Sequence, residues 1–115
     1  MMDREIFAEQ FLDRLEKHSN GEKLNAVELA NIIKDGDETT KAIIAIEELS
    51  ELQKELTKFI RDEPDEVGIL EEMADVYICL MTMQKIFCFD GKILDAAIEV
   101  KLLRLKDNLE NGGKD

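Results

Sequence analysis

Two short acidic segments of this sequence share one pattern of side chains. IEELSEL at residues 46–52 is matched residue by residue by LEEMADV at residues 70–76. Each segment carries two carboxylates three residues apart: Glu48 and Glu51 in the first, Glu72 and Asp75 in the second. Oxygen-only ligands suit Mg²⁺ or Mn²⁺, and four neighbouring carboxylates repel strongly unless cations or protons neutralise them. The pattern therefore indicates either one divalent-metal site or two solvated acidic helix faces.

The positions of these acids around their predicted helices favour the metal site. In both segments apolar residues recur at alternating steps of four and three, which is the spacing of a helix seam that packs against a neighbour. The seams consist of Ala45, Leu49, Leu52, Leu56 and Phe59 in the first helix and Ile69, Met73, Val76, Leu80 and Met83 in the second. At about 100° per residue, the first acid of each pair lies roughly 50° from the centre of its seam and the second roughly 110°, on the same side. If the helices pack antiparallel along their seams, we expect all four carboxylates to converge on one cleft.

Helical patterns cover most of the chain and are separated by short breaks. The predicted helices span residues 3–18, 24–34, about 40–61, about 64–87 and 92–110, with Asp37 or Thr39 as a cap and Pro64 as a helix start. Short connections between helices favour antiparallel neighbours. The expected fold is an all-α antiparallel four-helix bundle with an additional N-terminal helix. The predicted organisation is an N-terminal helical extension at 1–23, a helical domain at 24–110 and a flexible tail at 111–115.

The composition narrows the class of protein. With 115 residues, 44% hydrophobic and 37% charged, the sequence is typical of one folded, helix-rich domain. A net charge of −12 argues against a nucleic-acid partner. The N-terminus does not resemble a signal peptide, and the most apolar stretch, residues 76–83, is too short to span a bilayer. We therefore expect a cytoplasmic protein with no membrane contact, in which Cys79 and Cys88 are reduced thiols in or near the core.

The two acidic motifs resemble the signature of a known family, the MazG-like all-α nucleoside triphosphate pyrophosphohydrolases. That signature reads EExxE followed, after a gap, by ExxD, and the sequence has Glu47-Glu48-Leu49-Ser50-Glu51 and later Glu72-Met73-Ala74-Asp75. The resemblance covers roughly residues 24–106. It implies a four-helix bundle that assembles as a homodimer or homotetramer. It also implies Mg²⁺-dependent hydrolysis of an NTP or dNTP to the monophosphate and pyrophosphate.

The resemblance also assigns roles to individual residues. The implied metal-binding and catalytic residues are Glu48, Glu51, Glu72 and Asp75, the set that the helical spacing selects independently, with Glu47 as an outer-shell carboxylate. The basic stretch KLLR matches one that follows the third helix in the family, so Lys101 and Arg104 are candidates for binding the triphosphate. The alternative for these two cations is ordinary placement near a helix C-terminus, which the helix dipole favours.

Two other classes of protein compete with this hypothesis. Ferritin-like di-metal bundles need Glu-x-x-His motifs, but the single histidine, His18, follows Leu15 at that spacing, which excludes the class. A non-catalytic helical oligomerisation or interaction protein is the remaining alternative, because residues 42–46 and 76–83 are apolar nearly all round their helices. Dependence on Mg²⁺ separates this alternative from the enzyme.

Overall fold

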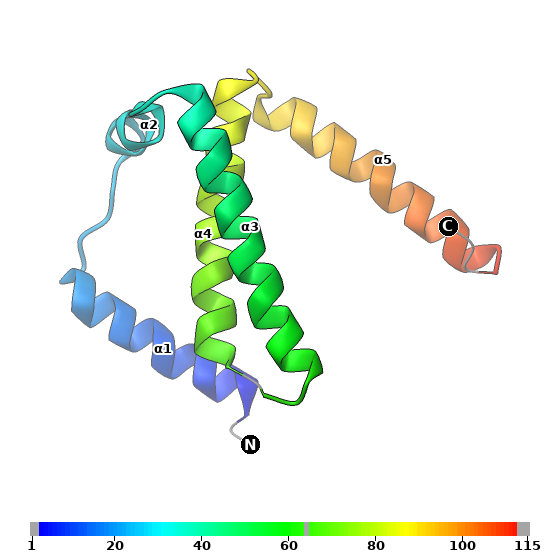
Figure 1. The fold of residues 1–115 in the computed structure, drawn as a ribbon, viewed down its shortest axis with the longest axis horizontal. Coiled ribbons are helices and arrows are strands. Elements are labelled where there is room, and N and C mark those ends of the chain that lie inside the picture. Colours follow the sequence, from blue (N-terminus) through cyan, green and yellow to red (C-terminus); the bar gives the residue numbers. More distant parts are fainter. Residues whose placement is uncertain (1–2, 64, 113–115) are drawn as a thin grey trace. The chain divides into compact units, whose positions relative to one another are not determined.

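The computed structural model describes residues 3–63 and 65–112, which form five helices and no strand (Figure 1). The helices are α1 (Arg4–Ser19), α2 (Ala26–Lys34), α3 (Glu38–Ile60), α4 (Glu66–Ile86) and α5 (Gly91–Glu110). The all-α prediction is confirmed. The predicted helix start at Pro64 and residues 113–115 of the predicted tail lie outside the described residues. The chain divides into two compact units: the first ends at Ile32 and contains α1, and the second begins at Ile33 and contains α3, α4 and α5.

Side-chain caps explain where the helices begin. The N-caps of α1, α3, α4 and α5 are Asp3, Asp37, Asp65 and Asp90, and each carboxylate accepts a backbone N–H of its helix's first turn. In α2, Asn25 Oδ1 accepts the backbone N–H of Glu28 at 2.9 Å, and Glu28 Oε1 accepts that of Asn25 at 3.2 Å. A carboxylate at the start of a helix accepts hydrogen bonds from backbone N–H groups that have no partner within the helix, and its charge interacts favourably with the helix dipole. Of the two predicted caps of α3, it is Asp37 that accepts from its first turn.

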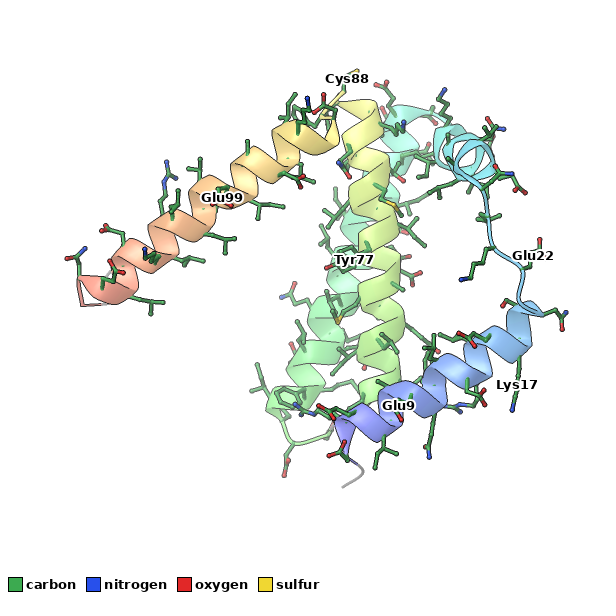
Figure 2. The ribbon with its side chains drawn as sticks, turned by 180° about the vertical axis from the view of Figure 1, so that it is seen from behind. Glu9, Lys17, Glu22, Tyr77, Cys88 and Glu99 are labelled. Carbon is green, nitrogen blue, oxygen red and sulfur yellow. The ribbon has the colours of Figure 1, made fainter. Side chains whose placement is uncertain are left out.

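Helices α3 and α4 lie side by side and run antiparallel, so that these two consecutive helices form a hairpin (Figure 1). They are the pair of helices that pack along each other in the described residues, and α5 packs against no other helix there. Side chains project from every side of α5 (Figure 2), and none of its residues is buried. One chain thus supplies a two-helix hairpin, and the four-helix bundle stays a prediction.

The hairpin contact includes half of the seam residues and extends to the acidic side of both helices: Ala45 is buried, and Leu52, Ile69, Val76 and Met83 are half-buried. Ala45 of α3 and Cys79 and Thr82 of α4 are buried. Five seam residues stay 42–51% exposed: Leu49, Leu56, Phe59, Met73 and Leu80. From helix periodicity, the centre of the contact is shifted from each seam toward the carboxylates, by roughly 40° in α3 and roughly 70° in α4. The two seams therefore pack against each other only in part, because the other half of their residues stays on the surface.

The small side chains along the contact explain this rotation. Alanine, cysteine, threonine and Gly68 let the two backbones approach closely, whereas the wider leucine, methionine and phenylalanine side chains of the seams would hold them apart. The rotation has the same sign along each helix, and the helices run in opposite directions. Both seams consequently turn to one face of the hairpin, which we call the seam face: Leu49, Leu56, Phe59, Met73 and Leu80.

Candidate metal centre

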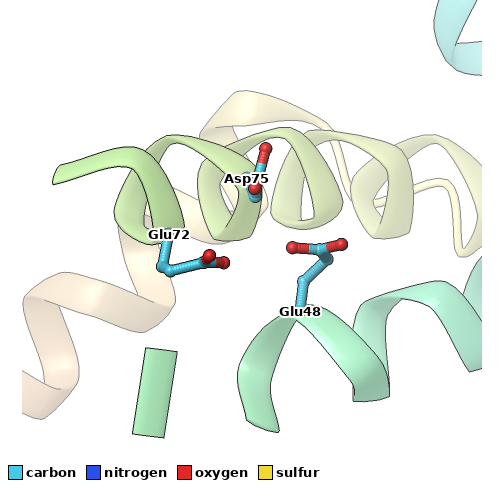
Figure 3. Close-up of side chains that lie close together, drawn as sticks. All are labelled: Glu48, Glu72 and Asp75. Carbon is cyan, nitrogen blue, oxygen red and sulfur yellow. The ribbon is translucent and has the colours of Figure 1, made fainter. Parts of the chain in front are cut away.

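Three carboxylates from two helices converge in the hairpin. Glu48 of α3 and Glu72 and Asp75 of α4 each offer an oxygen, and these oxygens all lie within 4.8 Å of one another (Figure 3). Each of the three residues is half-buried. Glu72 and Asp75 reach the same place because residues three apart in sequence are neighbours on one side of a helix. The structure thus brings together three of the four residues predicted as metal ligands.

The fourth predicted ligand, Glu51, lies beside this cluster but not within it. It is exposed on α3, and its negative charge helps to raise the pKa of both Glu48 and Glu72. Glu47 is also exposed on α3 and is not part of the converging set. The outer-shell role of Glu47 and a ligand role for Glu51 stay predictions.

The pKa values of two members of the cluster are raised above those of ordinary carboxyl groups. For Glu72 the largest cause is burial, followed by the charges of Asp75, Glu51 and Glu55. For Glu48 burial is again the largest cause, followed by the charge of Asp75 and a hydrogen bond shared with it. Both pKa shifts mean that the fully ionised cluster is unfavourable. A bound cation or a shared proton would reduce the repulsion between these carboxylates.

One oxygen of Glu72 provides a direct test of whether a cation fits. Glu72 Oε2 is buried and has no hydrogen-bond partner. A buried carboxylate oxygen without a partner is costly, and a divalent cation would supply that partner. Oxygens that bind one Mg²⁺ lie roughly 3–4 Å apart. Oxygens within 4.8 Å of one another reach that geometry when side-chain rotations move them by about an ångström. The donor set consists of carboxylates only, which suits Mg²⁺ or Mn²⁺.

Two further residues, Glu55 and Cys79, lie at this contact and were not predicted as part of the site. The prediction of a thiol in or near the core is confirmed for Cys79 and wrong for Cys88, which is exposed just after α4 ends. Glu55 of α3 has a side chain only 15% exposed, and its Oε2 lies 3.3 Å from Lys58 Nζ. The thiol of Cys79 is buried, and burial together with the charges of Glu48 and Asp75 raises its pKa. Glu55 stands seven residues after Glu48, and Cys79 four residues after Asp75, so each shares a helix face with a candidate ligand. This spacing is the signal that could have found them.

A close approach at Gly68 places Glu55 against α4. A Cβ atom at this position would lie 2.8 Å from Glu55 Oε2 and 2.6 Å from Asp65 Oδ2. Lys58 Nζ bridges the same two carboxylates, since it also lies 3.9 Å from Asp65 Oδ2. Lys58 thereby offsets negative charge at the turn end of the hairpin, while the oxygens of Glu48, Glu72 and Asp75 have no cation among the ion pairs of the described residues.

The predicted triphosphate-binding cations lie on a different helix. Lys101 and Arg104 are exposed on α5, and α5 packs against neither α3 nor α4 in the part of the chain that the structure describes. Within one chain these two residues are not brought against the acidic cluster by helix packing. Their role in substrate binding stays a prediction.

Comparison with known proteins finds no match to a family model, to a curated protein or to a solved structure. Among the described residues, no helix combines the length and apolar character needed to cross a membrane. What the site can do therefore rests on its own geometry and on the sequence motifs.

Proposed function

We propose that the protein is a Mg²⁺-dependent nucleoside triphosphate pyrophosphohydrolase, which hydrolyses an NTP or dNTP to the monophosphate and pyrophosphate. The observation that carries this proposal is the convergence of Glu48, Glu72 and Asp75 from two helices. The paired motifs that resemble the MazG-like family support it. The same resemblance suggests a cytoplasmic enzyme that removes non-standard or surplus nucleotides, with a MazG-like four-helix bundle formed in a homodimer or homotetramer.

The charge balance explains why such a cluster would bind a triphosphate. The substrate carries about four negative charges, so an acidic cluster binds it only through cations. Glu48, Glu72 and Asp75 would hold Mg²⁺, and Mn²⁺ could replace it, with Glu51 beside them as a further ligand. When bound, Mg²⁺ neutralises phosphate charge and polarises the phosphoryl oxygens.

The residues of the cluster also supply a proton acceptor. Hydrolysis between the α and β phosphates needs a base for the proton of the attacking water. One carboxylate of the cluster would take this proton. Lys101 and Arg104 would bind the triphosphate if a neighbouring copy brings α5 to the site.

The experiment that tests this function measures both possible phosphate products. A panel of NTPs and dNTPs is incubated with the protein and Mg²⁺, and pyrophosphate and orthophosphate are assayed separately. Glu72→Gln should abolish turnover, as should a chelator, whereas Glu71→Gln removes an adjacent, exposed carboxylate of α4 and should leave turnover unchanged. Hydrolysis in ¹⁸O-labelled water shows which phosphorus is attacked, because the label enters either the monophosphate or the pyrophosphate.

The alternative function is a non-catalytic helical interaction protein. It is favoured by one observation, the small number of buried apolar residues in the described part of the chain: Ile33, Ala45 and Cys79. Absence of turnover with every nucleotide, together with absence of Mg²⁺ binding in calorimetry, would favour this alternative. Orthophosphate as the sole product would instead mean that a different phosphate bond is cleaved.

A further inference from the structure

A second group of carboxylates lies between α3 and α4, closer to the connection between these helices than the candidate metal centre. Glu55 of α3 and Asp65, the N-cap of α4, both approach Gly68: a Cβ atom there would lie 2.8 Å from Glu55 Oε2 and 2.6 Å from Asp65 Oδ2. The two oxygens are thus no further apart than the sum of these distances. That separation is comparable to the 4.8 Å within which the oxygens of the metal centre lie. The hairpin therefore carries two groups of acidic oxygens.

The ammonium group of Lys58 offsets the charge of this second group. Its Nζ lies 3.3 Å from Glu55 Oε2 and 3.9 Å from Asp65 Oδ2, and it donates a hydrogen bond to Glu55 Oε1 at 3.4 Å. Much of this contact is shielded from water, because the side chain of Glu55 is 15% exposed and that of Lys58 is 31% exposed. Salt screens such an ion pair less than it screens a pair on the open surface.

Two buried oxygens without a hydrogen bond show how the two groups of carboxylates differ. In the described part of the chain these atoms are Glu55 Oε2 and Glu72 Oε2. Glu55 Oε2 has the ammonium group of Lys58 as its counter-ion, whereas no ion pair of the described residues includes Glu72. Residue spacing explains the difference, because a lysine stands three residues after Glu55 but another carboxylate stands three residues after Glu48 and after Glu72.

We propose that Lys58 is an internal cation that closes the second group to metal ions, so that the hairpin binds one divalent cation per chain, at Glu48, Glu72 and Asp75. The inference rests on the metal centre of the proposed function and adds the number of bound ions and the residue that sets this number. Lys58 is covalently attached, so its ammonium group is present at a high effective concentration. A divalent ion at Glu55 would have to displace this group and would then be repelled by the freed positive charge.

A count of bound Mn²⁺ on the full chain tests this inference, because the electron paramagnetic resonance signal of the free ion measures how much remains unbound. The wild type should bind one ion per chain, and Glu72→Gln should lose it. Lys58→Met keeps a long side chain but removes its charge, so this variant should bind a second ion and double the capacity. Lys58→Arg keeps the positive charge and should bind one ion, like the wild type.

Three controls separate the role of Lys58 from general effects of charge and folding. Lys54→Met removes the same charge from an exposed position of α3 and should leave the capacity at one ion. Adding Glu55→Gln to Lys58→Met removes a ligand of the second group and should abolish the second ion. Circular dichroism checks that each variant is folded. An unfolded variant would lose ions and not gain one, because the carboxylates of two helices would no longer converge.

The possible outcomes distinguish this inference from the proposed function. Two ions on the wild type, one ion on Lys58→Met or two ions on Lys54→Met would each overturn the inference. The proposed function would still stand, because release of pyrophosphate decides it. One ion on the wild type and two on Lys58→Met, without hydrolysis of any nucleotide, would support the role of Lys58 and overturn the proposed function. No bound ion on any of these proteins would overturn both.

Discussion

Glu72→Gln should change the thermal stability of the protein in opposite directions with and without Mg²⁺. Without a divalent cation the wild type holds three carboxylates whose oxygens lie within 4.8 Å of one another, and Glu72 has a raised pKa. That separation is shorter than the Debye length of about 8 Å at physiological ionic strength, so added salt screens the repulsion only partly. Removing one charge therefore makes the cation-free variant melt at a higher temperature than the wild type.

With Mg²⁺ the order of the two proteins reverses. For a dissociation constant of about 0.1 mM, within the range of weak carboxylate sites, 10 mM Mg²⁺ stabilises the wild type by about 2.7 kcal/mol. In a domain of this size that corresponds to a rise in melting temperature of roughly 10 °C. The variant lacks the ligand with the buried, unpartnered oxygen and should gain only a small part of this shift.

Differential scanning fluorimetry or circular dichroism measures both shifts. The control is NaCl at the ionic strength of the Mg²⁺ sample, which separates binding from general screening. Glu71→Gln serves as the matched variant, since it removes an exposed charge from the same helix. Equal stabilisation by NaCl and Mg²⁺, or an equal Mg²⁺ effect on Glu72→Gln, would refute the reasoning that the cluster is a cation site.

Three further predictions concern pH, packing and thiol chemistry. A group whose folded pKa is raised stabilises the fold below its unfolded pKa, so the cation-free wild type should lose stability as pH rises from about 4.5 toward the raised pKa of Glu72. In melting experiments across this pH range, Glu72→Gln should show a smaller loss of stability with pH. An identical pH dependence in the variant would contradict the prediction. In urea unfolding, Gly68→Ala should raise the free energy of unfolding by much less than the ~1 kcal/mol that helix propensity favours, because the new Cβ would lie 2.6 and 2.8 Å from two carboxylate oxygens. A full gain of ~1 kcal/mol would show that both carboxylates move freely. With a thiol-reactive dye, exposed Cys88 should react at least ~100-fold faster than buried Cys79, whose pKa is raised by burial, and Cys88→Ser should remove the fast phase; a fast phase that survives would place Cys79 at the surface.

The helices and their starts could be predicted from the sequence because they depend on local chemistry. Apolar spacing and capping residues such as Asp37 act within one or two turns, so they are visible in the sequence. The same holds for the convergence of Glu48 with Glu72 and Asp75, which follows from their matching positions on two antiparallel neighbours.

The rotation of the hairpin contact could not be predicted from the same pattern. Periodicity identifies the apolar side of a helix, but it does not say whether that side is covered by the same chain or by another molecule. The contact instead follows the small residues Ala45, Gly68 and Cys79, and it is this rotation that buries Glu55. The location of Lys101 and Arg104 relative to the acids depends on where α5 packs, which is a non-local property that no spacing on α5 encodes.

The origin of all three converging carboxylates in one hairpin has a consequence for mixed populations of chains. Contacts between α3 and α4 join segments that are close in sequence, so they form early and need no second chain. Each chain then carries a complete set of Glu48, Glu72 and Asp75, whatever assembly it later joins. When wild-type chains are mixed with Glu72→Gln chains, the cation-binding capacity should be directly proportional to the fraction of wild-type chains. A Glu72→Gln copy should not reduce cation binding by a wild-type copy in the same assembly.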